Sequence, residues 1–171
     1  VLRPLTRTER LFQRGVDKHI SVSHSGAKYF EKALGRAVQA VPNGLSFGRE
    51  YSNLEEKRTL QRNLLRITDG IKLITIVGRL VPWKGHEVFL KAFSKAVNRH
   101  PKTRALVVGH DPIPTQDHLK KLNTLAQELG IDHKVEFLSW QEDIKLIYAA
   151  SDLIVHASTE PEPFGLVILE A

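Results

Sequence analysis

Two glutamates near the end of the chain, Glu162 and Glu170, are the first residues whose types and placement could do chemistry. Two prolines around Glu162 exclude a continuing strand, and Gly165 precedes a short apolar run that predicts a helix. N–H groups at a helix start favour an anion, whereas a carboxylate beside them repels phosphate and accepts hydrogen bonds from hydroxyls. Residues 156–171 therefore predict a site for a sugar nucleotide. The alternative is that both glutamates merely suit the helix dipole.

A second set of candidates lies in the loop from Gly78 to Gly85, which follows an apolar run at 71–77. The guanidinium of Arg79 can form bidentate hydrogen bonds with phosphate oxygens, and the ammonium of Lys84 can attract phosphate as a point charge. The loop is neither a G-x-G-x-x-G dinucleotide motif nor a G-x-x-x-x-G-K-[ST] phosphate loop. The alternative is that both cations are merely solvated, but the two glycines leave room for a ligand beside them.

The eight histidines show no metal-binding spacing, and no G-x-S-x-G nucleophile motif is present. His156 ends a predicted strand beside the glutamates, and we interpret it as a structural histidine rather than a catalytic one. His110 and Asp111 follow another predicted strand and could line the same crevice.

Strands and helices alternate from residue 71 onward. The sequence predicts strands at 71–77, 105–108, 135–138 and 153–155, and helices at 86–98, 119–129, 144–148 and from 166 onward. This alternation predicts an α/β fold: a Rossmann-like parallel sheet with helices on both faces. In such a sheet the ligand crevice lies beyond the carboxyl ends of the strands, where the candidate residues fall.

The first part of the chain is less regular. It predicts a weak surface helix within 1–15, a strand at 19–23, a helix at 27–34, a strand at 37–41, a linker at 46–53 and an exposed helix at 54–66. Pro42-Asn43-Gly44 is a strong turn signal after the second of these strands.

The composition is that of a globular protein, with 42% hydrophobic and 26% charged residues among 171. The absence of cysteine excludes disulfides and cysteine-bound zinc, and the absence of methionine leads us to expect a fragment of a longer protein.

No apolar run of membrane-spanning length and no signal peptide is present, so we expect a cytoplasmic protein. The net charge of +6 suits an anionic ligand or a membrane surface, but the scattered basic residues do not support nucleic-acid binding.

Three segments, GRLVPWKGHEVFLKAF, LVVGHD and STEPEPFGLVILEA, together resemble the donor-binding domain of retaining glycosyltransferases of family four. That family has the two-domain glycosyltransferase B fold and a pair of glutamates with seven residues between them, which Glu162 and Glu170 match. Arg79 and Lys84 match its G-R-x-x-x-x-K-G segment. The resemblance covers residues 71–171 well and 16–47 more loosely.

The resemblance implies a domain division and a set of roles. Residues 1–48 would end the acceptor-side N-terminal domain, and 49–171 would form a nucleotide-sugar-binding domain that is truncated at its C-terminus. Arg79 and Lys84 would hold the donor diphosphate and steady the leaving group without a required metal, and Glu162 would contact the transferred sugar. The remaining donor-binding residues would be Gly78, Phe164, Gly165, Leu166, Ser139 and Glu170, of which Glu170 would bind the ribose. The segment Leu138-Ser139-Trp140 would lie by the base, and Ser139 stands where the family usually has glycine.

The expected activity is therefore transfer of a hexose, with retention, from a nucleotide-diphosphate sugar to a saccharide or lipid-linked acceptor. We expect no cofactor and no metal. Association with the inner face of a membrane is left open. A sugar-nucleotide epimerase of the same fold and a non-catalytic sugar-nucleotide-binding module remain alternatives. The fragment by itself is expected to be inactive, because residues 1–171 would supply one wall of the crevice.

Overall fold

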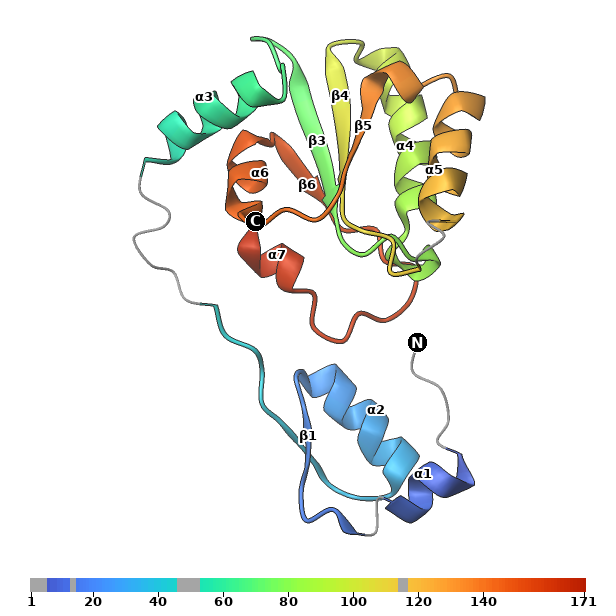
Figure 1. Cartoon of the computed structure of the whole chain (residues 1–171). Helices are drawn as coiled ribbons and strands as arrows, with labels where there is room; N and C mark the ends of the chain where they lie inside the picture. The colour runs from blue at the N-terminus through green and yellow to red at the C-terminus, as the bar shows by residue number, and fades with distance from the viewer. Residues whose placement is uncertain (1–5, 13–14, 46–52, 114–116) are drawn as a thin grey trace. The chain divides into compact units, whose positions relative to one another are not determined.

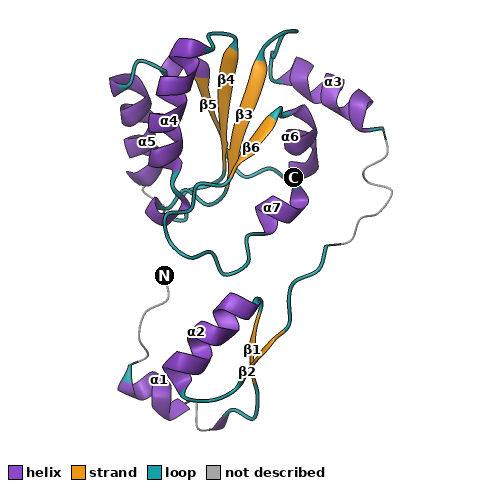
Figure 2. Ribbon diagram, turned by 180° about the vertical axis from the view of Figure 1, so that it is seen from behind, coloured by secondary structure: helices purple, strands orange, loops and turns teal. Residues whose placement is uncertain are grey.

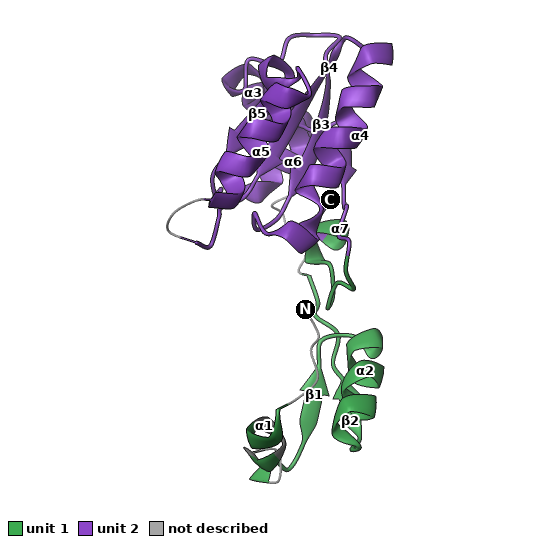
Figure 3. Ribbon diagram, turned by 90° about the vertical axis from the view of Figure 1, so that its right-hand side faces the viewer, with its two compact units in different colours: residues 1–46, 160–169 green, residues 47–159, 170–171 purple. Residues whose placement is uncertain are grey.

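The computed structural model describes residues 6–12, 15–45, 53–113 and 117–171 (Figure 1). The chain forms two compact units, one of residues 1–46 and 160–169 and the other of residues 47–159 and 170–171 (Figure 3). The predicted linker at 46–53 lies outside the described residues except for its last position. The division into an acceptor-side and a donor-side domain stays a prediction.

The first unit contains a small parallel pair of strands. Its elements are α1 (Arg7–Phe12), β1 (His19–Ser21), α2 (His24–Leu34) and β2 (Val38–Ala40), and β1 pairs with β2. α2 begins three residues earlier than the apolar pattern predicts, because the side chain of Ser23 accepts a hydrogen bond from the Gly26 N–H at 3.0 Å and caps the helix. The helix ends at Gly35, whose φ of 66° is in the left-handed region that favours glycine.

The second unit is built on a four-stranded parallel sheet with the order β5-β4-β3-β6. Its elements are α3 (Leu54–Leu64), β3 (Lys72–Val77), the 3₁₀ turn η3 (Pro82–Lys84), α4 (His86–Arg99), β4 (Thr103–Val108), α5 (Asp117–Glu128), the 3₁₀ turn η4 (Asp132–Lys134), β5 (Val135–Leu138), α6 (Ile144–Ala150) and β6 (Leu153–Val155); α7 (Leu166–Glu170) ends in this unit. The predicted alternation is confirmed, with boundaries shifted by one or two residues. The two 3₁₀ turns were not predicted.

The sheet buries both of its faces, with α4 and α5 on one and α6 on the other, as Figures 1 and 2 show. Along β4, Ala105 and Val107 pack into the cluster under α4 and α5, whereas Leu106 and Val108 pack into the cluster under α6. Successive side chains of a strand point to opposite faces, so a strand covered on both faces needs a continuous apolar run. That is why the four-residue apolar run at 105–108 predicts this strand.

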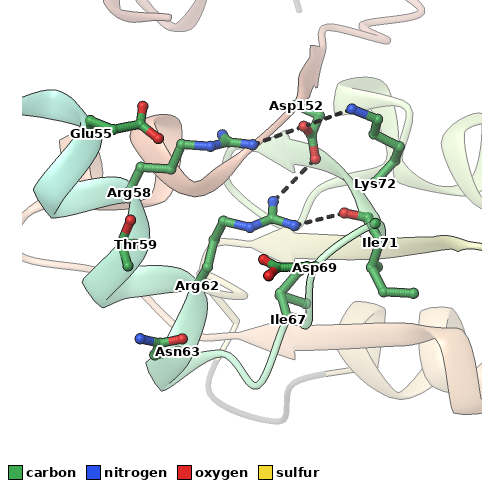
Figure 4. A pocket seen from close by; sticks show the side chains of 11 residues that line it. Glu55, Arg58, Thr59, Arg62, Asn63, Ile67, Asp69, Ile71, Lys72 and Asp152 are labelled. Atoms are coloured by element: carbon green, nitrogen blue, oxygen red, sulfur yellow. Dashed lines mark hydrogen bonds and ion pairs between the residues drawn. The ribbon is translucent and has the colours of Figure 1, made fainter.

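α3 is attached to the sheet by charge rather than by an apolar face. No residue of α3, all of which the structure describes, is buried. Its Arg58 and Arg62 instead form ion pairs with Asp152, at 2.8 Å and 3.1 Å (Figure 4). Lys72 lies 3.5 Å from the same carboxylate, and the N–H of Leu73 donates to it at 2.8 Å. Asp152 thereby joins α3, the start of β3 and the start of β6.

The two guanidinium groups also donate hydrogen bonds to backbone carbonyl oxygens. Arg62 donates to the carbonyl oxygens of Ala150 at 3.0 Å and Ile71 at 2.7 Å. Burial raises the pKa of Asp152, but the Leu73 N–H and the two arginines lower it more, so the pKa lies below its ordinary value. The side chain of Asp152 is 18% exposed, which makes this ion pair stronger than one on an open surface.

We predict that Asp152→Asn destabilises the second unit by about 2 kcal/mol at neutral pH, because two partly buried guanidinium groups lose their anionic partner. The folded-state pKa of Asp152 is lowered, so its contribution is fully present above about pH 4 and is lost as the pH falls below that value. Urea unfolding of the full-length protein measures the loss. Asp132→Asn, on a side chain that is 57% exposed, is the control and should change little. Equal midpoints for the two variants would contradict the role of Asp152.

Candidate functional site

The carboxyl ends of β3, β4 and β5 meet at one edge of the sheet, and the loops that follow continue the hydrogen-bonded register. Gly78 N–H donates to the Val108 carbonyl, and Gly109 N–H donates to the Leu138 carbonyl, both at 2.9 Å. A pocket of about 410 Å³ opens there, lined by Val77, Gly78, Arg79, Val108, Gly109, His110, Trp140, Gln141, Glu142, Ile144, Tyr148 and Glu170. Its volume falls in the range of small-ligand sites. The predicted crevice is thus confirmed as a cavity of the second unit.

The floor of this pocket depends on two glycines. A Cβ on Gly109 would overlap the carbonyl oxygen of Gly78, so a side chain there would force the two loops apart. Next to them, the N–H of Leu80 donates to the His110 carbonyl at 2.9 Å, and Leu80 itself is buried. The β3 and β4 loops are therefore fixed to each other immediately beside Arg79.

Arg79 is anchored by its backbone and exposed at its side chain. Its carbonyl oxygen accepts from the Val81 N–H at 2.8 Å, while its guanidinium, which lines the pocket, has no hydrogen-bond or ion-pair partner among the described residues. A guanidinium presents its donors in a planar fork that fits phosphate oxygens. This arrangement provides an anion-binding group at the pocket mouth.

Lys84 ends the η3 turn and lies close to the same loop. Its Cδ is 3.6 Å from the position that a Cβ on Gly78 would take, and its Nζ lies 4.5 Å from the centroid of the Trp83 ring. Lys84 does not line the pocket itself, but its stem borders Gly78, which does. Both predicted cations therefore lie next to Gly78, Arg79 in the chain and Lys84 in space.

The Lys84 loop is held by the segment that follows β6. Gly85 has a φ of 74°, and a Cβ there would overlap the carbonyl oxygen of Ala157. The carbonyl of Trp83 accepts from the N–H of Thr159 at 2.8 Å. Both contacts fix the loop against residues 157–159, so the position of Lys84 depends on backbone that is distant in the sequence.

Glu170 lines the pocket and is held by a residue whose role the sequence did not reveal. The hydroxyl of Tyr148 donates to Glu170 Oε2 at 2.8 Å. In the sequence Tyr148 is simply one position on the face of a short predicted helix. The sequence signal that could have identified Tyr148 as a site residue was a hydroxyl-bearing aromatic residue on a helix expected to border the crevice. That signal is weak, because many helices carry a tyrosine without any role in a site.

Ser139 is exposed and does not line the pocket. Its carbonyl oxygen, like that of Trp140, accepts a hydrogen bond from the side-chain amide of Gln141, at 3.1 Å and 3.3 Å. The pocket residues of this loop are Trp140, which is 65% exposed, Gln141 and Glu142. An exposed indole offers a flat apolar face, so Trp140 is better placed than Ser139 to contact a base.

The remaining predicted site residues belong to the first unit. Glu162 and Phe164 are half-buried there, Gly165 is buried with a φ of 80°, and Leu166 is 37% exposed. Arg79, Lys84 and Glu170 belong to the second unit. The predicted cooperation of Glu162 with the two cations stays a prediction.

The other polar residues that the sequence pointed to, His110, Asp111 and His156, have different surroundings in the structure. His110 lines the pocket, whereas Asp111 caps α5, accepting from the N–H groups of His118 at 2.8 Å and Leu119 at 3.1 Å. Hydrogen bonds from the Ile113 N–H and from these two N–H groups lower the pKa of Asp111. His156 is exposed, and its Nε2 lies 3.3 Å from Ser158 Oγ; its structural role stays a prediction.

His86, at the start of α4, is completely buried, and neither of its ring nitrogens has a hydrogen-bond partner among the described residues. Its ring lies edge-on to the buried ring of His118, with 6.4 Å between centroids. Burial lowers the pKa of His86 to about 4, and the positive charges of His118 and Lys84 act in the same direction. His86 is therefore neutral at pH 7.

Two negative findings apply to the residues that the structure describes. No three His, Asp or Glu side chains among them gather closely enough to hold a metal ion, and the expectation of a metal-free site stays a prediction. None of their helices has both the length and the apolar character needed to cross a bilayer.

Comparison with known proteins places the chain in a family. The family described as "Glycosyl transferases group 1" matches residues 57–171. The chain belongs to this family. It is 35% identical over 139 residues to the D-inositol 3-phosphate glycosyltransferase of Corynebacterium jeikeium, covering 79% of this chain and 33% of the relative. It is also 35% identical over 139 residues to the mannosylfructose-phosphate synthase of Agrobacterium fabrum, covering 78% of this chain and 30% of the relative.

The solved structure of HepE from Anabaena, in complex with UDP and glucose, superposes on this group 1 glycosyl transferase with a TM-score of 0.84. The two share 29% identity, and the match covers 98% of this chain and 46% of HepE. This likeness confirms the predicted α/β fold of the glycosyltransferase B type. The chain spans about a third of the length of the curated relatives and about half of HepE. Membership of family four and retention of configuration stay predictions.

We predict that Gly85→Ala destabilises the protein more than Gly70→Ala does. Both substitutions place a Cβ at a similar positive φ, 74° and 78°, but the surroundings of Gly70 are open within 4 Å. Gly70→Ala should therefore cost only the backbone strain of about 1–2 kcal/mol, and Gly85→Ala should add the overlap with Ala157. Urea unfolding of the two full-length variants measures both losses of stability. Equal losses would show that the loop at Gly85 can shift freely.

A second prediction concerns acid stability. The unfolded chain takes up a proton at His86 near pH 6.5, whereas the folded protein does so near pH 4. Stability is therefore complete above pH 6.5 and falls as the pH decreases towards 4, with a loss of about 2 kcal/mol between pH 7 and pH 5.

His86→Leu should remove this part of the pH dependence, and His133→Gln, on an exposed ring, should retain it. The measurement is urea unfolding of the full-length protein at pH 7 and pH 5. The assignment to His86 is wrong if the His86→Leu variant loses as much stability as the wild type.

Proposed function

We propose that the full-length protein transfers a hexose, with retention, from a nucleoside-diphosphate sugar to a saccharide or lipid-linked acceptor. The observation that carries this proposal is the pocket at the carboxyl edge of the sheet, which Arg79 and the carboxylate of Glu170 line together. Among the described residues, the guanidinium of Arg79 has no hydrogen-bond or ion-pair partner. A nucleoside diphosphate presents an anion and a pair of ribose hydroxyls at once, so it needs a cation and a hydroxyl acceptor in the same site.

In this reaction the bond between the anomeric carbon and the diphosphate oxygen breaks, and negative charge grows on the leaving diphosphate. Arg79 and Lys84, which both lie next to Gly78, would stabilise that charge without requiring a metal ion. Glu162 would accept hydrogen bonds from the hydroxyls of the transferred sugar, and the backbone of residues 164–166 would lie against the sugar and phosphate.

The relatives support the chemical class of the donor. HepE has been solved in complex with UDP and glucose and in complex with UDP-glucose. The relatives from Corynebacterium jeikeium and Agrobacterium fabrum carry names of sugar-transferring or sugar-synthesising enzymes. An epimerase gains no support from these matches. The chain has no cysteine that would require an oxidising compartment, which fits the cytoplasm as the proposed location, with or without contact to a membrane.

A non-catalytic sugar-nucleotide-binding module is the alternative of a different class. It would bind the same donor through the same pocket but would release no nucleoside diphosphate. Measuring nucleoside diphosphate release from a panel of sugar nucleotides by the full-length protein separates the two functions.

The experiment that tests the proposal compares wild type with Arg79→Ala in the full-length protein. Wild type should be stabilised in thermal-shift assays by UDP or another nucleoside diphosphate, because a ligand of the folded state raises its stability by mass action. Arg79→Ala should lower donor turnover by about 10-fold to 100-fold through loss of a charge-assisted phosphate contact, with an unchanged melting temperature in the absence of ligand.

Arg99→Ala is the matched control, because Arg99 is an exposed arginine at the far end of α4 and lines no part of this pocket. It should leave turnover and ligand stabilisation unchanged. A flat response of wild type to all nucleoside diphosphates and their sugars would refute donor binding. Full activity of Arg79→Ala would show that the diphosphate is held by other groups.

A further inference from the structure

The hydrogen bond between Tyr148 and Glu170 joins two elements at the wall of the pocket. Tyr148 lies on α6 and Glu170 ends α7, and both side chains are half-buried and line the cavity. The phenol donates to Glu170 Oε2 at 2.8 Å, a distance typical of a hydrogen bond to a carboxylate. The second carboxylate oxygen, Oε1, has no hydrogen-bond partner among the described residues.

This geometry fixes the orientation of the carboxylate. A glutamate side chain has several rotatable bonds, and a ligand that must immobilise it loses part of its binding free energy. With Oε2 held by the phenol, the rotamer is restricted before a ligand arrives, and Oε1 remains available as an acceptor in the pocket. Because Glu170 is the last residue of a five-residue helix, its backbone alone restrains it weakly.

We propose that Tyr148 is a positioning residue that orients Glu170 towards the two vicinal hydroxyls of the nucleotide ribose. The inference rests on the proposed function, in which Glu170 accepts hydrogen bonds from that ribose. Tyr148 acts through Glu170 rather than through the ligand. Its contribution is therefore confined to ligands that carry ribose hydroxyls, and this distinguishes it from a residue that only supports the fold.

The test uses the full-length protein and two probes, UDP and 2′,3′-dideoxyuridine diphosphate, with dissociation constants measured by titration calorimetry. Tyr148→Phe should weaken UDP binding about fivefold, the factor that corresponds to one ordinary hydrogen bond, and should leave binding of the dideoxy probe unchanged. Tyr29→Phe removes a phenol from α2 in the first unit and should alter neither constant. The same Tyr148→Phe change in a Glu170→Ala background should have no effect on UDP, because its target is gone.

Each other outcome overturns the inference in a recognisable way. Equal weakening of both probes by Tyr148→Phe would mean that the residue supports the fold or another part of the ligand. Undiminished UDP binding by Tyr148→Phe would mean that Glu170 needs no positioning. If the wild-type protein binds both probes equally, Glu170 does not bind the ribose hydroxyls and the inference is wrong. The proposed binding of the donor would still stand. A wild-type protein that binds no nucleoside diphosphate would refute the proposed function together with this inference.

Discussion

The carboxylate of Asp152 holds together three parts of the second unit that are distant in the sequence. It joins Arg58 and Arg62 of α3 to the start of β6 and accepts from the backbone at the start of β3. Because β6 is an edge strand paired with β3 alone within the described sheet, this ion-pair cluster secures the strand at the end where it enters the sheet. The segment after β6 in turn contacts the loop that carries Lys84, through Ala157 and the Trp83 carbonyl.

The candidate site follows from this framework by simple geometry. Three parallel strands end at one edge, and the close approach of Gly78 and Gly109 lets their loops continue the register instead of separating. Arg79 then has a fixed backbone and a solvent-facing guanidinium, a combination that suits a ligand carrying negative charge. His86, which directly follows the Lys84 loop in the chain, is buried and neutral, so it adds no positive charge at pH 7.

Much of the fold was predictable because strands and helices leave patterns of apolar residues that are close together in the sequence. A strand covered on both faces requires a continuous apolar run, and 105–108 supplied one. The predicted start of α2 was three residues too late. The hydrogen bond from the Gly26 N–H to the Ser23 side chain sets where the helix begins, and the first apolar residue comes later. α3 was correctly predicted as an exposed helix, but what attaches it could not be predicted, since the partner of Arg58 and Arg62 lies about ninety residues away.

The sequence by itself determined the alternation of strands and helices, the glycine loops and the cations at the strand ends, because each depends on residues close together in the chain. Tertiary structure alone decided which polar groups meet. It made Asp111 a helix cap rather than a wall of the crevice, selected Trp140 from the segment Leu138-Ser139-Trp140 to line the pocket, and brought Tyr148 to Glu170. The physical reason is that a hydrogen bond between residues 22 positions apart is directional and short, so it forms only where packing has already fixed both backbones.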